Sequence, residues 1–154
     1  MLNYLFFDTI KDSTIDITSE KLTKELAKEF TKYFKGGEFV FLYGEMGVGK
    51  TPFVKYFINE YQKINNLTQT EITSTTFSLL NEYQVKDIRI KHYDLFRINR
   101  KEDFNNLDIF EKDNKLITLI EWPQLIADKQ DINFITLTFN YLNDLNDRTV
   151  DIKV

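Results

Sequence analysis

The sequence contains no cysteine, and only two prolines and five glycines among its 154 residues. Without cysteine, disulfides, thiolate metal sites and thiol nucleophiles are excluded. No apolar run approaches the ~18–20 residues that a membrane-spanning helix needs. The N-terminal residues, MLNYLFFDTIKDSTID, lack a basic segment followed by a long apolar core, so they do not resemble a secretion signal. We therefore expect a cytoplasmic protein without a membrane partner.

An excess of positive charge is also missing. The formal net charge is −4, whereas a protein that binds nucleic acid by itself usually carries a positive field. Hydrophobic residues make up 42% and charged residues 29% of the chain, as in ordinary soluble globular proteins. No repeat, low-complexity tract or Gly/Pro/Ser-rich linker divides the chain. We expect one domain over residues 1–154; the sequence leaves its oligomeric state open, with a monomer as the default.

Hydrophobic periodicity predicts helices in the first half of the chain. One amphipathic helix covers residues 18–34, where Thr18 or Ser19 can cap the first turn and Gly36-Gly37 ends the helix. A second amphipathic helix begins after Lys50. The polar segment 100–114, broken by apolar residues, predicts one or two short helices.

Apolar runs predict the strands between these helices. They lie at residues 3–8, 38–44, 77–85, 87–96 and 115–123, with two more within 131–154. A turn at Lys86-Asp87 predicts that the third and fourth strands form a hairpin. Helices alternate with strands early and hairpins follow later. We therefore expect a three-layer α/β domain with a mixed, partly parallel β-sheet flanked by helices.

A glycine-rich segment stands between a predicted buried strand and a predicted helix. Residues 44–51, GEMGVGKT, fit the phosphate-loop pattern G-x-x-x-x-G-K-[ST] without a gap, in the context that this pattern requires. Glycines let backbone N–H groups approach phosphates, and the helix adds its positive N-terminal end. The sequence thus predicts a P-loop NTPase-like domain. Its expected nucleotide-binding residues are Gly44, Glu45, Met46, Gly47, Val48, Gly49, Lys50, Thr51 and Pro52.

Two side chains of this loop have expected chemical roles. Lys50 would neutralise the β- and γ-phosphates, and the Thr51 hydroxyl would join the shell of a Mg²⁺ ion. Pro52 is compatible with the first turn of a helix, but it has no N–H to offer to a phosphate. We expect this missing donor to weaken nucleotide binding by about 1 kcal/mol.

A phosphate loop needs an acidic residue for Mg²⁺ at the end of a neighbouring strand. Glu121 ends the apolar run LITLIE, and Asp94 follows RIKHY. A solvated strand-end charge for Glu121 and an ion pair of Asp94 with Arg97 remain alternatives. We expect His92, the only histidine, to be a packed or hydrogen-bonded residue rather than a catalyst.

The sequence says less about which nucleobase is bound and which reaction follows. No N-K-x-D element for guanine is present, which favours ATP. The four arginines are scattered at positions 89, 97, 100 and 148, whereas a small-molecule kinase usually needs a cluster of them. The residues by themselves leave an ATPase, a kinase and a non-hydrolysing nucleotide-dependent scaffold open.

Four motifs in order resemble one family. They are GEMGVGKT, STTFSLLNEY (74–83), HYDLFR (92–97) and IEWP (120–123). Together they resemble the TsaE (YjeE) family of bacterial ATPases of tRNA threonylcarbamoyladenosine synthesis, over about residues 15–150. The resemblance implies binding and hydrolysis of ATP with Mg²⁺, chiefly when the protein is docked on TsaB and TsaD, with tRNA contacted indirectly through that complex. It also implies that hydrolysis resets the complex between turnovers.

The resemblance further implies roles for single residues. Glu121 takes the role of the family glutamate in Mg²⁺ coordination and turnover, and Asp94 acts beside it through water. Thr76 lies in a loop that resembles a γ-phosphate sensor. Trp122 lies beside the nucleotide, with core packing as the alternative. Ser19, or its neighbour Thr18, contacts the adenine side, with helix capping as the alternative.

Two residues depart from the family pattern. Thr75 replaces a usual proline, so the loop at Thr76 loses a rigid residue. Phe96 replaces a usual tyrosine and removes its hydroxyl. With Pro52, these departures indicate a divergent member with low intrinsic activity.

Overall fold

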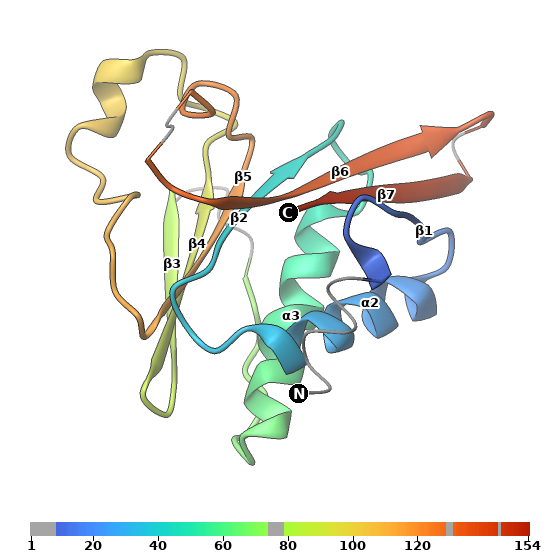
Figure 1. The fold of residues 1–154 in the computed structure, drawn as a ribbon, viewed down its shortest axis with the longest axis horizontal. Coiled ribbons are helices and arrows are strands. Elements are labelled where there is room, and N and C mark those ends of the chain that lie inside the picture. The colour runs from blue at the N-terminus through green and yellow to red at the C-terminus, as the bar shows by residue number, and fades with distance from the viewer. Residues whose placement is uncertain (1–8, 74–78, 129–130, 145) are drawn as a thin grey trace.

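The strands of the chain join into one sheet. The structure, a computed structural model, describes residues 9–73, 79–128, 131–144 and 146–154. Seven strands form the sheet in the order β1-β7-β6-β2-β5-β4-β3 (Figure 1). Their bounds are β1 Thr14–Asp16, β2 Phe39–Tyr43, β3 Leu80–Val85, β4 Ile88–Asp94, β5 Leu116–Glu121, β6 Phe134–Leu142 and β7 Asp147–Lys153. The helices are α2 Glu20–Tyr33, α3 Lys50–Ile64 and the 3₁₀ turn η1 Lys101–Phe104.

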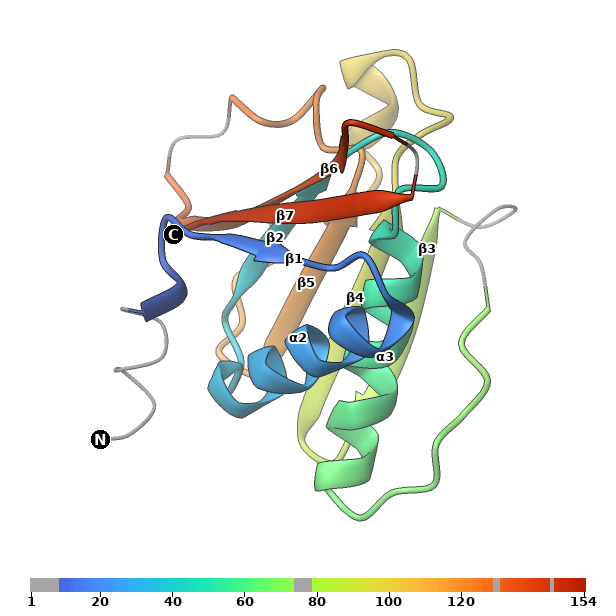
Figure 2. The ribbon, with the colours of Figure 1, turned by 90° about the vertical axis from the view of Figure 1, so that its right-hand side faces the viewer.

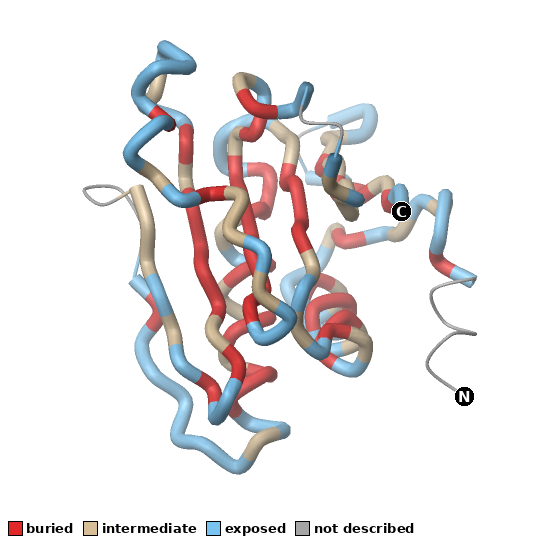
Figure 3. The backbone as a smooth tube through the Cα atoms, turned by 60° about the vertical axis from the view of Figure 1, so that its left-hand side comes forward, coloured by how far each residue is buried: buried red, intermediate tan, exposed pale blue. Residues whose placement is uncertain are grey.

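The sheet is mixed, as predicted. Its centre consists of four parallel strands, β6, β2, β5 and β4. Strand β3 pairs antiparallel with β4 at one edge, and β7 and β1 pair antiparallel at the other. All six residues of β5 are buried, as expected for a strand covered on both faces (Figure 3).

Both helices lie on one face of the sheet (Figure 2). There Phe30 of α2 and Phe57 of α3 share a core with alternate strand residues such as Leu42 and Leu119. The intervening strand residues point to the opposite face and pack against the connecting segments. That second core consists of Phe41, Tyr93, Leu95, Phe104, Ile109, Ile120 and Ile126. The layer on this face therefore contains η1 and irregular chain, and the three-layer α/β class is confirmed.

Most local predictions agree with the structure. Ser19 caps α2, because its Oγ accepts a hydrogen bond from the Leu22 N–H at 3.2 Å. The hairpin turns at Lys86-Asp87, as Val85 pairs with Ile88. The segment 100–114 contains one short 3₁₀ turn. The short strand β1 was not predicted, and the strand predicted at 3–8 lies outside the described residues.

The carboxyl ends of the central parallel strands meet at one edge of the sheet. Strand β2 ends at Tyr43 and continues into the glycine-rich loop, and the neighbouring strands end at Glu121 and Asp94, which are register partners. In α/β sheets with parallel strands, ligands bind outside these carboxyl ends. The topology therefore brings the predicted loop and both predicted carboxylates together.

The link between α2 and β2 depends on a backbone that only glycine tolerates. Gly36 has φ +117°, and a Cβ there would overlap the backbone of Asn114. Gly37 also has positive φ, +94°, but a Cβ there would meet its nearest atom at 3.9 Å, an ordinary contact distance. Both glycines thus have a positive φ that other residues rarely adopt, but only Gly36 has no room for a Cβ.

We predict that Gly36→Ala is more destabilising than Gly37→Ala. Both variants incur the cost of positive φ, but only the first adds an overlap with backbone, worth an additional ~1–3 kcal/mol. Urea denaturation of both variants measures the difference. Equal losses of unfolding free energy would contradict the close packing of Gly36 on Asn114.

Candidate nucleotide site

The glycine-rich loop has no room for a side chain at Gly44, its first residue. Gly44 has φ +144°, and a Cβ there would lie 2.8 Å from Val48 Cγ1 and 2.9 Å from the Phe139 carbonyl oxygen. These are distances that real Cβ atoms do not show. The sequence uses glycine here because the chain must turn tightly between β2 and α3, which is the backbone of a phosphate cradle.

Lys50, the first residue of α3, folds back over this loop. Its ammonium donates to the carbonyls of Gly44 and Glu45, the latter at 3.0 Å, and lies 4.1 Å from the centroid of the Trp122 ring. The residue is only 4% exposed. Burial lowers the pKa of Lys50 from its ordinary value, and the negative charges of Glu121, Asp94 and Glu45 oppose this decrease.

Glu121 joins the loop to the sheet. The Thr51 hydroxyl donates to Glu121 Oε1 at 2.9 Å, and Nε2 of His92 lies 2.6 Å from Oε2. Glu121 is 2% exposed and His92 is fully buried. The alternative of a solvated strand-end charge for Glu121 is therefore wrong. A buried carboxylate is stable only when hydrogen bonds or cations satisfy it, and Glu121 has one partner on each oxygen.

His92 is a packed, hydrogen-bonded residue, as predicted, but sequence reasoning missed its partner. Its Nδ1 has no hydrogen-bond partner within the described part of the chain. A proton on Nδ1 would be a buried donor without an acceptor, so we assign the hydrogen bond with Glu121 to an Nε2–H donor. The contact depends on the parallel register of β4 and β5, which places both residues near the same strand ends and which no local sequence pattern encodes.

Asp94 lies beside Glu121 at the end of β4. The two residues are register partners on neighbouring strands, and Asp94 Oδ1 accepts a hydrogen bond from the Phe96 N–H at 3.1 Å. Asp94 is partly exposed, in contrast to Glu121. Its charge acts on Lys50, so all three ionisable groups belong to one electrostatic cluster.

Trp122 has an unusual backbone directly after Glu121. Its φ is +57°, which is a strained region for a bulky residue and typical of functional sites when the surroundings enforce it. The half-buried ring contacts both the Lys50 ammonium and the Phe96 ring, whose centroid is 4.9 Å away. The tryptophan therefore does more than fill the core: it contacts the central cation of the loop.

The remaining predicted residues differ in how far the structure describes them. Pro52 is exposed in the first turn of α3, where Phe53 N–H donates to the Gly49 carbonyl at 3.2 Å, so the helix accommodates the proline. Glu45, Met46 and Gly47 are exposed on the loop. Ser19 caps α2, and its predicted contact with adenine stays a prediction. Thr76 and Thr75 lie outside the described residues.

The residues present fit a nucleotide with Mg²⁺. Within the ranges that the structure describes, no three His, Asp or Glu side chains form a ready-made metal cage. Mg²⁺ commonly binds through one or two carboxylates together with substrate phosphates and water. A hydroxyl–carboxylate pair beside a phosphate cradle, as formed by Thr51 and Glu121, is compatible with that mode.

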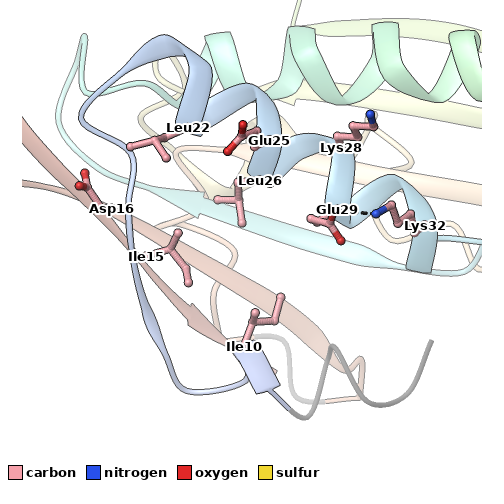
Figure 4. Close-up of a pocket in the computed structure, with 9 residues that line it drawn as sticks. All are labelled: Ile10, Ile15, Asp16, Leu22, Glu25, Leu26, Lys28, Glu29 and Lys32. Carbon is pink, nitrogen blue, oxygen red and sulfur yellow. Dashed lines mark hydrogen bonds and ion pairs between the residues drawn. The ribbon is translucent and has the colours of Figure 1, made fainter. Parts of the chain in front are cut away.

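A separate groove lies away from this site. It runs between α2, β1 and Ile10, and it is lined by apolar residues such as Leu22 and Leu26 with charged residues at its rim (Figure 4). The Glu29–Lys32 pair, 2.6 Å apart, spans part of that rim. None of its lining residues belongs to the glycine-rich loop. Among the described helices, none is both long enough and apolar enough to cross a bilayer.

The strand, glycine loop and Lys-Thr helix start on a mixed sheet define a P-loop NTPase-like fold. Residues 17–150 match the profile of the family described as threonylcarbamoyl adenosine biosynthesis protein TsaE. The chain belongs to the TsaE family, whose members serve tRNA threonylcarbamoyladenosine biosynthesis.

Individual relatives agree with this membership. The chain is 36% identical to the tRNA threonylcarbamoyladenosine biosynthesis protein TsaE of Rickettsia typhi over 137 residues, which cover 89% of this chain and 92% of the relative. It is 35% identical to the protein of that name from Aquifex aeolicus, over 70% of this chain and 74% of the relative. The crystal structure of Bacillus subtilis YdiB superposes with a TM-score of 0.66 at 21% identity, covering 90% of this chain and 82% of that one. This structural similarity supports the fold.

We predict that the fluorescence of Trp122, the only tryptophan, reports the protonation of Lys50. Loss of the ammonium proton removes the cation from the ring, so the emission should change with a midpoint below pH 10.5, the ordinary lysine value. Glu121→Gln should move the midpoint to lower pH, because the Glu121 carboxylate stabilises the ammonium. An alkaline fluorescence titration measures both.

Lys50→Met is the control for this titration. It should lack the transition and keep only the background from tyrosine ionisation. If the transition persists in Lys50→Met, or moves to higher pH in Glu121→Gln, the contact of Lys50 with Trp122 and Glu121 is contradicted.

Proposed function

We propose that this chain binds ATP with Mg²⁺ and hydrolyses it as an accessory protein of tRNA threonylcarbamoyladenosine modification. It acts on the complex of TsaB and TsaD and resets that complex between turnovers. The protein is a weak ATPase alone and becomes active when docked on these partners.

The observation that carries the proposal is the 2.9 Å hydrogen bond between Thr51 and Glu121. It places the hydroxyl of a phosphate-loop threonine and a buried strand-end carboxylate at one point, in a chain of the TsaE family. This is the arrangement by which P-loop NTPases hold Mg²⁺. A glycine turn without nucleotide chemistry gives no reason to bury Glu121 there.

The chain's own residues then have defined roles. The loop amides and Lys50 bind the β- and γ-phosphates, and Thr51 and Glu121 hold the metal. When bound, Mg²⁺ supplies positive charge that neutralises the phosphate oxygens during hydrolysis. His92 fixes the Glu121 carboxylate, and Asp94 orients water beside it. Trp122 holds the Lys50 ammonium above the loop until phosphate replaces the carbonyl contacts.

Exposed apolar residues at the site support activation by a partner. Met46 on the loop is 65% exposed, and Phe96, which contacts Trp122, is 47% exposed. Both belong to segments that border the carboxyl edge of the sheet. A docking partner would cover them and exclude water from the phosphates, which strengthens the electrostatic interactions there. The acidic net charge of −4 agrees with tRNA being bound by the partners.

A scaffold that binds ATP without hydrolysing it is the second candidate. The observation in its favour is Pro52, which removes one N–H from the start of α3. A kinase is less favoured, since Arg89 pairs with Glu111 at 2.6 Å and Arg100 with Asp103 at 3.3 Å, both outside the loop.

Single-turnover ATP hydrolysis, with and without TsaB and TsaD, tests the proposal. We expect the partners to accelerate hydrolysis, and Lys50→Ala and Glu121→Gln to reduce the accelerated rate at least ~100-fold, as for loss of a group that stabilises transition-state charge. Lys63→Ala, an exposed lysine on the same helix, is the matched control and should hydrolyse normally.

The modification of tRNA is measured in parallel with ATP and with a non-hydrolysable analogue. If hydrolysis stays at background while ATP and the analogue support modification equally over many turnovers, the scaffold is correct and the ATPase proposal fails. Full support of modification by Lys50→Ala and Glu121→Gln would exclude any nucleotide role.

A further inference from the structure

The β6–β7 hairpin lies against the glycine-rich loop, and Figures 1 and 2 show the two side by side. Phe139 closes the space at Gly44. Tyr141 and Arg148 are cross-strand partners further along the hairpin. A Cβ placed on Gly47 would lie 3.7 Å from the Tyr141 hydroxyl. A Cβ placed on Gly49 would lie 3.6 Å from Arg148 Nη1.

Arg148 connects the loop to the segment that precedes α2. Its Nη1 donates to the Val48 carbonyl at 3.4 Å, and its Nη2 donates to the Thr18 carbonyl at 3.1 Å. Its backbone N–H also donates to the Thr18 hydroxyl at 3.1 Å. One guanidinium thus bridges two carbonyls from segments that are far apart in sequence. Its planar fork of donors suits such a bridge, which the single ammonium of lysine does not reproduce.

The charge of Arg148 has no carboxylate partner among the described residues, in contrast to Arg89 and Arg100. The side chain is half-buried beside the loop. A guanidinium carries five N–H donors, and the bridge to Val48 and Thr18 uses two of its nitrogens. A cation that has no carboxylate partner and lies next to a phosphate-binding loop stabilises a bound polyphosphate.

The Val48 carbonyl lies outside the hydrogen-bond ladder of α3, because the helix begins at Lys50 and its cap, Gly49, has a non-helical backbone. The Arg148 guanidinium supplies a donor to this carbonyl, so that this end of the loop has a fixed orientation.

We propose that Arg148 is a positioning residue of the nucleotide site. By holding the Val48 carbonyl against Thr18, it orients the following amides of the loop toward the phosphates of a nucleoside di- or triphosphate. This inference rests on the proposed function, because it assumes that the loop binds a nucleotide. Arg148 acts through the loop and is not required for the chain to fold.

Calorimetric titration with Mg²⁺–ATP and Mg²⁺–ADP tests the proposal. We expect Arg148→Gln to weaken both affinities at least tenfold. Arg148→Lys keeps the charge but not the fork, and it should remain at least fivefold weaker than the wild type. Arg100→Gln, a surface arginine paired with Asp103, is the matched control and should bind like the wild type.

Thermal unfolding of each variant without nucleotide separates positioning from folding. We expect midpoints within about 3 °C of the wild type, as for the loss of ~1 kcal/mol or less in a domain of this size. If Arg148→Lys binds the nucleotides with wild-type affinity, the claim that the guanidinium bridge positions the loop is refuted. A much larger loss of stability in both variants would also overturn the proposal, because Arg148 would then be structural.

Failure of this inference and failure of the proposed function give different results. If the wild type binds ATP, Lys50→Ala does not, and both Arg148 variants bind like the wild type, only the role of Arg148 is refuted. If the wild type itself binds neither nucleotide, the proposed function fails with it.

Discussion

The hydrogen bond from the Thr51 hydroxyl to Glu121 joins the start of α3 to the end of β5, two elements that are 70 residues apart in the chain. It depends on the parallel pairing of β2 with β5, which brings the glycine-rich loop and the strand-end carboxylate to one edge of the sheet. The helices, the core and the hairpin hold this edge in place. The nucleotide chemistry proposed for the chain follows from this contact.

Burying charged groups near this contact costs free energy, and polar and aromatic contacts with these groups offset that cost. Lys50 and Glu121 are almost fully buried, as is the His92 ring. The Lys50 and Glu121 charges would each be expensive alone, since a buried charge without a partner loses its hydration. The carbonyls of the loop, the Trp122 ring and the imidazole compensate this loss, and the strained backbone of Trp122 positions the ring. Such a site is preorganised before any phosphate arrives.

The sequence predicted the features that local patterns encode. The strand–loop–helix unit around Lys50 follows from glycine spacing, and β5 follows from a continuous apolar run that ends at Glu121. Long-range pairing escaped prediction. The strand at Thr14–Asp16 has only three mostly exposed residues and so carries no apolar pattern. The approach of Arg148 to Val48 spans 100 residues and depends on how the β6–β7 hairpin packs against the glycine-rich loop, which no local motif specifies.

A double-mutant cycle on Thr51 and Glu121, read out as the affinity for Mg²⁺–ATP, tests the central claim most directly. If the hydroxyl and the carboxylate hold one metal ion together, Thr51→Val and Glu121→Gln should each weaken binding, and the double variant should lose clearly less than their sum. A coupling free energy of about 1 kcal/mol or more is expected for two groups in one network. Additive losses, or binding unaffected by either change, would contradict a shared metal site at this edge of the sheet.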